Sequence, residues 1–135
     1  MTTPGPLLAS LYVALGGGTG AVLRFQLGRL VTHWFGANLA FPWATFAANV
    51  IGSLAMGVLV GFLARHGHGG ETWRLLLGVG MLGGFTTFSS FSMEMVLLAE
   101  RGAMAMATAY AGFSLLAGIA AMFLGLLAMR AAGSV

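Results

Sequence analysis

The stretch Gly83-Gly84-Phe85-Thr86-Thr87-Phe88-Ser89-Ser90-Phe91-Ser92 lies in the second half of an uncharged segment that runs from Leu75 to Met93. A bilayer crossing takes about 20 apolar residues of helix, so this segment is long enough to span a membrane. Its two glycines and five hydroxyl residues weaken the hydrogen bonding of a regular helix. We therefore expect a transmembrane helix that is broken in mid-span, with freed carbonyls that are buried in protein or line a cavity.

Three more uncharged segments predict the rest of the fold. Only 7% of the 135 residues are charged and 59% are hydrophobic, whereas about a quarter of the residues in a soluble domain are charged. The sequence therefore predicts an all-α membrane protein, in which residues 1–135 form a single domain of four transmembrane helices. The expected helices run from about Leu7 to Val31, from Pro42 to Ala64, from Thr72 to Ala99, and from the turn at Gly102 to about Met129.

Composition also excludes several classes of protein. The pI near 10.7 does not indicate nucleic-acid binding, because the arginines lie singly at the ends of the expected spans, where they anchor helices at the membrane surface. The sequence contains no recognisable nucleophile–base pair or metal-ligand cluster, so we expect no enzymatic activity. His66 and His68 form a pair in a glycine-rich linker, and we expect this pair to be solvated.

The six arginines divide evenly between the two sides of the expected bundle. Orientation is normally set by an excess of Lys and Arg on cytoplasmic loops, and this chain has no such excess. Both orientations are therefore expected to coexist, which allows an antiparallel homodimer equivalent to the inverted repeats of larger transporters. The alternative is that the insertion machinery selects one orientation. The two groups are Arg24, Arg29 and Arg101 on one side, and Arg65, Arg74 and Arg130 on the other.

Polar residues recur inside the expected spans at helical spacing. Thr45, Asn49 and Ser53 form one stripe on the second helix. Tyr110 and Ser114 form another stripe on the fourth helix. Each stripe is consistent with a seam of interhelical hydrogen bonds and equally with the wall of a conduction path, since lipid gives polar groups no partner.

Phe88 and Phe91 lie three residues apart on the third helix, so their rings share a face. Such a pair more often packs against lipid or protein than binds a ligand. The edge of a phenyl ring carries partial positive charge, however. Two ring edges that face a pore could therefore hold a small anion without a formal cation.

Three motifs in this order make the chain resemble, from end to end, the Fluc (CrcB) family of bacterial fluoride channels. The stretch from Gly83 to Ser92, followed by Glu94, is similar to the signature of that family and is the most specific match. The other two motifs are Gly17-x-x-Gly20-Ala21-x-x-Arg24 in the first helix and Thr45-x-x-x-Asn49-x-x-Gly52-Ser53 in the second.

The resemblance implies a fluoride-selective channel that exports fluoride down its gradient across the bacterial cytoplasmic (inner) membrane. It implies an antiparallel, dual-topology homodimer with two pores and a central structural sodium ion (Na+), held by the backbone carbonyls of Gly83 and Thr86. The implied partners are fluoride, a second copy of the chain and the lipid bilayer. Two positions depart from the family pattern: Ala44 stands where a glycine is common, and Gly118 stands where a third hydroxyl is often found.

The resemblance also implies a role for each pore residue. Phe88 and Phe91 would line the pore, with the amide of Asn49 as a donor to fluoride. Neutral donors suit this task, because a pore site must bind weakly enough to release the ion. The remaining residues are Thr87, Ser90, Tyr110 and Ser114 in a polar track opposite the rings, Arg24 near the vestibule, and Glu94 at the end of the signature.

Two other functions are consistent with parts of the sequence. A small dual-topology, proton-coupled exporter of toxic compounds would need an acidic residue in mid-span. The candidate for this acid is Glu94, which lies towards the end of the third helix. A non-conducting scaffold protein is the second alternative, although packing alone rarely requires polar stripes on three helices.

Overall fold

The fold is given by a computed structural model that describes residues 4–36, 40–66 and 70–132, the side chain of His66 excepted. Within these ranges every element of secondary structure is a helix. The predicted all-α fold with four helices able to cross a membrane is therefore confirmed. The side chains of His66 and His68, which we expected to be solvated, lie outside the described part of the structure. The four spans are Pro6–Phe35, Trp43–Arg65, Gly70–Glu100 and Met104–Ala131.

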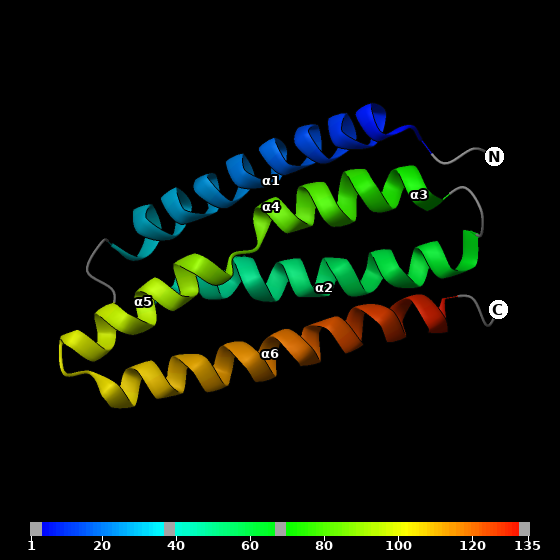
Figure 1. Cartoon of the computed structure of the whole chain (residues 1–135). Helices are drawn as coiled ribbons and strands as arrows, with labels where there is room; N and C mark the ends of the chain where they lie inside the picture. The colour runs from blue at the N-terminus through cyan, green and yellow to red at the C-terminus, as the bar shows by residue number, and fades with distance from the viewer. Residues whose placement is uncertain (1–3, 37–39, 67–69, 133–135) are drawn as a thin grey trace.

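Three of the spans are continuous helices that run back and forth along the bundle (Figure 1). They are α1 (Pro6–Phe35), α2 (Trp43–His66) and α6 (Met104–Ala131). α1 begins at a proline, whose missing N–H costs nothing in the first turn. It ends at Phe35 and is followed by Gly36, where a φ of 86° favours glycine. α1 is several residues longer at its C-terminal end than the sequence predicted, because nothing before Gly36 interrupts it.

The third span consists of several helical pieces and one extended interruption. α3 (Gly70–Trp73), the π-helix η2 (Arg74–Leu82) and α4 (Gly83–Phe85) form its upstream half. α5 (Phe88–Glu100) forms its downstream half. Thr86 and Thr87 lie between the halves with ψ angles of 160° and 126°, which are extended and not helical.

The predicted break is confirmed, but it lies later than the glycines. Gly83 and Gly84 remain helical, and the chain leaves the helix only at Thr86 and Thr87. A hydroxyl group explains this position, because the Thr87 side chain caps α5 by accepting a hydrogen bond from the Ser90 N–H at 3.2 Å. The π-helix upstream of the break was not expected from the sequence.

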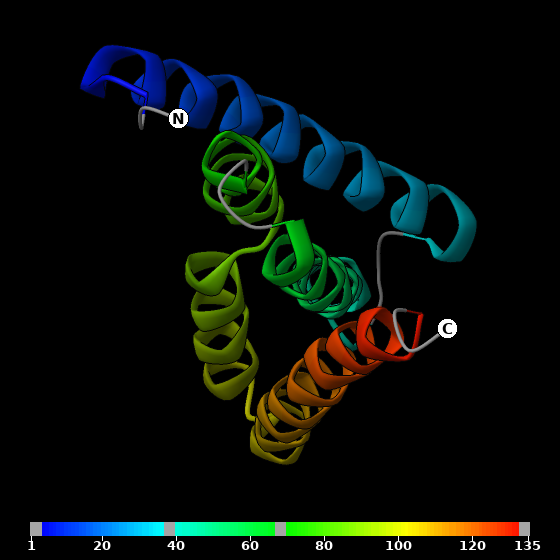
Figure 2. The same cartoon turned by 90° about the vertical axis from the view of Figure 1, so that its right-hand side faces the viewer.

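The two halves of the third span pack against different neighbours. The upstream half lies along α1, whereas α5 turns away and lies against α6 (Figure 1). Figure 2 shows the same divergence along the bundle, with α2 between the two groups. Glycine permits the close contacts: a Cβ on Gly20 of α1 would overlap the Met81 carbonyl oxygen. The break therefore lies where the third span changes partners.

Five of the six arginines lie near the ends of the bundle that the sequence predicted. Arg24 does not: it lies in mid-span, where its side chain reaches the Gly84 carbonyl at the break, so its expected place at a helix end is wrong. Arg29 and Arg101 lie near the end where α1 and α5 finish (Figure 1). Arg65, Arg74 and Arg130 lie near the opposite end, where α2 and α6 finish and the third span begins. Two arginines therefore lie near one end of the bundle and three near the other, and neither end has a large excess of positive charge.

Candidate functional site

The break in the third span is held by the side-chain amide of Asn49 from α2. The Thr87 N–H donates to Asn49 Oδ1 at 2.8 Å, and Asn49 Nδ2 donates to the Thr87 carbonyl at 3.1 Å. In a continuous helix the Thr87 N–H would bond to the carbonyl of Gly83 instead. Asn49 therefore replaces the lost helical bond, and the second N–H of its amide is left for a ligand.

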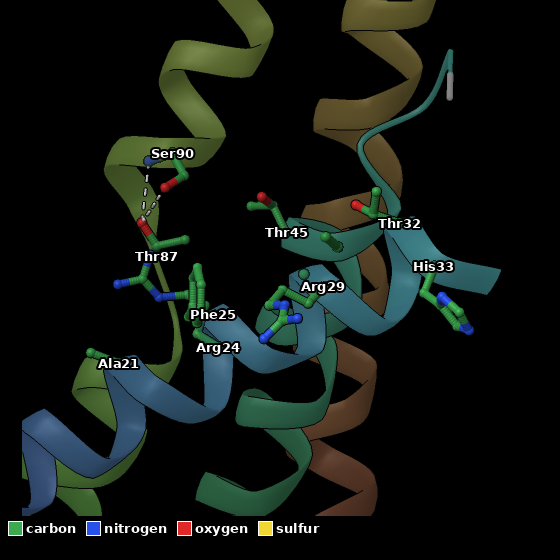
Figure 3. Close-up of a pocket in the computed structure, with 11 residues that line it drawn as sticks. Ala21, Arg24, Phe25, Arg29, Thr32, His33, Thr45, Thr87 and Ser90 are labelled. Atoms are coloured by element: carbon green, nitrogen blue, oxygen red, sulfur yellow. Dashed lines mark hydrogen bonds between the residues drawn. The ribbon is translucent and has the colours of Figure 1, made fainter. Parts of the chain in front are cut away.

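A first cavity of about 660 Å³, which we call the vestibule cavity, lies between α1, the start of α2 and the start of α5. Arg24 and Arg29 on α1 give it positive charge. Figure 3 shows the guanidinium of Arg24 on the side of the break and that of Arg29 on the side of Thr45, while His33 points away from both. The other lining residues are Ala21, Phe25, Gly28, Thr32, Ala44, Thr87 and Ser90.

A second cavity of about 500 Å³, which we call the phenyl cavity, contains both predicted pore rings. The ring centroids of Phe88 and Phe91 are 5.9 Å apart, and the ring planes are inclined by 37°. Phe88 is 80% exposed, so its ring does not belong to the core of its own chain. Thr87 lines this cavity and the vestibule cavity, so the two cavities adjoin at the break. The other lining residues are Asn49, Ser53, Thr86, Met95, Ala111, Ser114 and Leu115.

Ser114 gives the phenyl cavity a polar atom without a partner. Its Oγ is buried and makes no hydrogen bond to any residue that the structure describes. The large majority of buried hydroxyl groups are hydrogen-bonded. An unpartnered one in a cavity wall therefore indicates a place where a ligand or water completes the hydrogen bonding. Ser114 shares this wall with the amide of Asn49.

Glu94 accepts two hydrogen bonds from hydroxyl groups. Thr45 Oγ1 donates to Oε1 at 2.6 Å, and the Tyr110 hydroxyl donates to Oε2 at 2.7 Å. Within the described ranges Glu94 forms no salt bridge. Tyr110 is 0% exposed, and its ring centroid lies 5.0 Å from that of Phe91. Glu94 therefore fixes the orientation of Tyr110, and Tyr110 in turn supports the Phe91 ring.

The structure brings most of the predicted pore residues to these two cavities. Tyr110 and Glu94 line neither cavity and lie behind their walls, in contact with Phe91 and Thr45. The others divide between the cavities: Asn49, Phe88, Phe91 and Ser114 line the phenyl cavity, Arg24 and Ser90 line the vestibule cavity, and Thr87 lines both.

Sequence reasoning did not assign Thr45 and Phe41 to the site. Thr45 could have been predicted as a site residue, because it belongs to the polar stripe of α2. No pattern in the sequence indicated a role for Phe41, which precedes α2. Its ring centroid lies 5.2 Å from that of Tyr110 in an edge-to-face arrangement. This contact joins positions that are far apart in the chain, so local patterns do not predict it.

The backbone around the break offers oxygen ligands for a cation. The Gly83 carbonyl has lost the Thr87 N–H to Asn49, and Thr86 has left the helix, which removes its carbonyl from the helical ladder. Carbonyl oxygens are the ligands with which ion filters hold monovalent cations. Among the described residues, groups of three or more His, Cys, Asp or Glu that could bind a metal ion are absent. Carbonyl oxygens without helical partners are therefore a donor set that suits a monovalent cation such as Na+.

Comparison with known proteins shows similarity over almost the whole chain. The family model described as "CrcB-like protein, Camphor Resistance (CrcB)" matches residues 11–126. The fluoride-specific ion channel FluC of Novosphingobium aromaticivorans is 60% identical over 124 residues, which cover 92% of this chain and 98% of that protein. The protein of the same name from Erythrobacter litoralis is 52% identical over 133 residues, which cover 96% and 98% of the two chains. That from Phenylobacterium zucineum is 52% identical over 123 residues, covering 90% and 95%.

Proposed function

Because the chain belongs to the CrcB-like protein family, we propose that it is a fluoride-specific ion channel. The relatives are named as channels, so family membership confirms the prediction that the chain is not an enzyme. The observation that carries the proposal is the phenyl cavity, in which two phenyl rings meet neutral hydrogen-bond donors that are not fully used.

The phenyl cavity suits fluoride for chemical reasons. Fluoride is small and strongly hydrated, so a pore must replace its water with several hydrogen-bond donors. Ser114 Oγ and the second amide N–H of Asn49 are such donors, and the edges of Phe88 and Phe91 supply partial positive charge. No described arginine lines this cavity. The site is therefore weak enough for the ion to leave, as conduction requires.

We propose that fluoride enters through the vestibule cavity. The positive charges of Arg24 and Arg29 raise the local concentration of anions there. Thr87 lines both cavities and Ser90 lies beside it, so their hydroxyl groups mark the passage from one cavity to the other. Tyr110 and Glu94 contribute from behind the wall, by holding the Phe91 ring in place.

The finer architecture is also part of the proposal. We propose an antiparallel, dual-topology homodimer in the bacterial inner membrane, with two pores and a sodium ion held by carbonyls of Gly83 and Thr86 from both chains. The balance of arginines and the two carbonyls without helical partners support this arrangement. Tags on one chain terminus should report both sides of the membrane. A single uniform orientation would contradict the antiparallel dimer.

The exporter alternative receives no support from the geometry. A proton-coupled exporter would need Glu94 to face the substrate path. Glu94 lines neither of the two cavities, and both of its oxygens accept hydrogen bonds from hydroxyl groups. These contacts favour a role in holding Tyr110 over a role in carrying protons.

The test of the proposed function is fluoride efflux from liposomes in which the purified protein is the only protein, with a potassium ionophore present to balance the charge that leaves with fluoride. A fluoride-selective electrode should record rapid efflux, while protein-free liposomes retain the ion. Efflux that is no faster than that of protein-free liposomes would overturn the proposal. Because no protein partner or soluble cofactor is added, efflux would also show that the chain alone is sufficient.

A further inference from the structure

The carbonyl of Gly84 lies just before the break and needs a new hydrogen-bond donor. In a continuous helix it would accept from the N–H of Phe88. The extended residues Thr86 and Thr87 separate the two, because α5 begins only at Phe88. The structure supplies a replacement from another span: Arg24 Nε of α1 donates to the Gly84 carbonyl at 3.2 Å.

Backbone packing between α1 and α4 brings Arg24 to this carbonyl. Gly17, Gly20 and Arg24 share one face of α1. A Cβ on Gly84 would overlap the Gly17 carbonyl oxygen, and a Cβ on Gly20 would overlap the Met81 carbonyl oxygen. The two backbones are therefore in direct contact at the glycines. Arg24 lies one turn further along α1, where α4 ends.

α2 presents a matching pair of residues on the other side of the break. Gly52 follows Asn49 by three residues and lies on the same face of α2. A Cβ on Gly52 would overlap the Thr86 Cγ2 atom. This close approach leaves the amide of Asn49 within hydrogen-bond distance of the Thr87 backbone. Each neighbouring helix thus combines glycine with one polar side chain that reaches the break.

We propose that Arg24 is a positioning residue, which together with Asn49 clamps the extended segment between Gly84 and Thr87. The side chain has two separate tasks. Its Nε–H holds the carbonyl, while the terminal N–H groups of the guanidinium remain for the vestibule cavity (Figure 3). The inference rests on the proposed function, because the break sets the direction in which Thr87 and Phe88 face the ion path.

Arg29 provides a matched control for the charge of Arg24. It lies on the same helix and lines the same cavity. It is exposed, and its side chain forms no hydrogen bond or ion pair with the described part of the chain. Arg29→Met therefore removes one positive charge from the vestibule cavity without a contact to the break, whereas Arg24→Met removes the same charge together with the clamp.

Hydrogen exchange of the peptide that spans residues 83–92 tests the clamp directly. In Arg24→Met this peptide should exchange about ten-fold faster or more, which corresponds to the loss of one charge-assisted hydrogen bond. Arg29→Met should leave its exchange rate unchanged. Equal exchange rates in wild type, Arg24→Met and Arg29→Met would overturn the proposal.

The dependence of flux on fluoride concentration separates the clamp from the charge. Loss of the clamp should lower the flux at saturating fluoride, whereas loss of charge alone should mainly raise the fluoride concentration at half-maximal flux. We expect the first pattern for Arg24→Met and the second for Arg29→Met. If both variants showed only the second pattern, Arg24 would act through its charge and the proposal would be wrong.

A second variant and the exchange measurement itself cover the cases in which Arg24→Met does not fold or the protein carries no fluoride. If Arg24→Met does not give a monodisperse protein, Arg24→Lys takes its place, because it keeps the charge but replaces the fixed guanidinium fork with a flexible ammonium. Its peptide 83–92 should exchange several-fold faster than in wild type, and a wild-type rate would overturn the clamp. If the wild-type protein carries no fluoride, the proposed function fails, while the exchange rates still test the clamp.

Discussion

The two halves of the third span are built from different residues and pack in different ways. Upstream of the break, Gly80 and Gly84 lie against the backbone of α1 and leave no room for a side chain. Downstream, α5 packs through side chains, with the Phe91 ring against that of Tyr110 on α6. The difference indicates that backbone contact with α1 keeps the upstream half helical up to the break, whereas the downstream half supplies the rings that face the phenyl cavity.

The largest effect should come from breaking the upstream contact. Gly20→Val puts a side chain where the Met81 carbonyl oxygen lies, so we expect most of the folded protein to be lost. Overpacking of this kind typically costs about 1–3 kcal/mol, and here the neighbour is backbone that cannot move aside. The measurement is the yield of monodisperse protein in size-exclusion chromatography.

Gly18→Val is the matched control for that variant. It makes the same change in the same helix, but a Cβ on Gly18 meets no atom within 4 Å. Its yield should stay close to that of wild type. Similar yields of the two variants would show that backbone contact does not hold the upstream half in place.

The next largest effect should come from the junction between the halves. Asn49→Asp can still accept from the Thr87 N–H, but a carboxylate cannot donate to the Thr87 carbonyl or to fluoride. It also places negative charge on the wall of an anion path. We expect fluoride efflux from liposomes to fall roughly 100-fold while the protein stays monodisperse. Efflux at the wild-type rate would show that fluoride does not pass Asn49.

A smaller effect should come from the rings of the downstream half. Phe88→Ile and Phe91→Ile keep apolar bulk but remove the positive ring edge, so flux should fall about ten-fold at one or both positions. Phe88 is 80% exposed, so its replacement should change flux without changing stability. Wild-type flux in both variants would show that the rings only pack.

The smallest effect should come from the polar wall that faces the rings. The Ser114 hydroxyl has no partner in the described structure, so Ser114→Ala should not lower stability but should reduce flux about two- to ten-fold. The control is Thr108→Ala on the same helix, whose hydroxyl bonds to the Met104 carbonyl at 2.9 Å. Indistinguishable fluxes in the two variants would remove Ser114 from the pore.

Much of the fold could be predicted from the sequence, because spans depend on local composition. Uncharged segments of sufficient length predict four helices, and the hydroxyl residues predict a break in the third. The exact position of the break was harder to predict from the sequence. Gly83 and Gly84 looked like helix breakers, yet Gly84 stays helical because Gly17 of α1 packs directly against it. Such a contact between distant positions overrides the local preference of glycine.

The sequence indicated which residues form the candidate site, but it did not indicate the hydrogen bonds between them. Periodicity and the family motifs named Asn49, Phe88, Phe91 and Ser114, which the structure brings to one cavity. The bond of Asn49 to the Thr87 backbone joins two helices that only the tertiary fold brings together, and so does the contact between Glu94 and Tyr110. Hydrogen bonds of this kind leave no periodic signal in the sequence. The part that each residue plays in fluoride conduction stays a prediction.

Selectivity for fluoride can be measured as the reversal potential of the current that the purified protein carries in a planar bilayer. With a fluoride gradient across the bilayer and equal chloride on both sides, we expect a current that reverses at the equilibrium potential of fluoride. A current that follows an imposed chloride gradient, or transport that requires a proton gradient, would contradict this expectation.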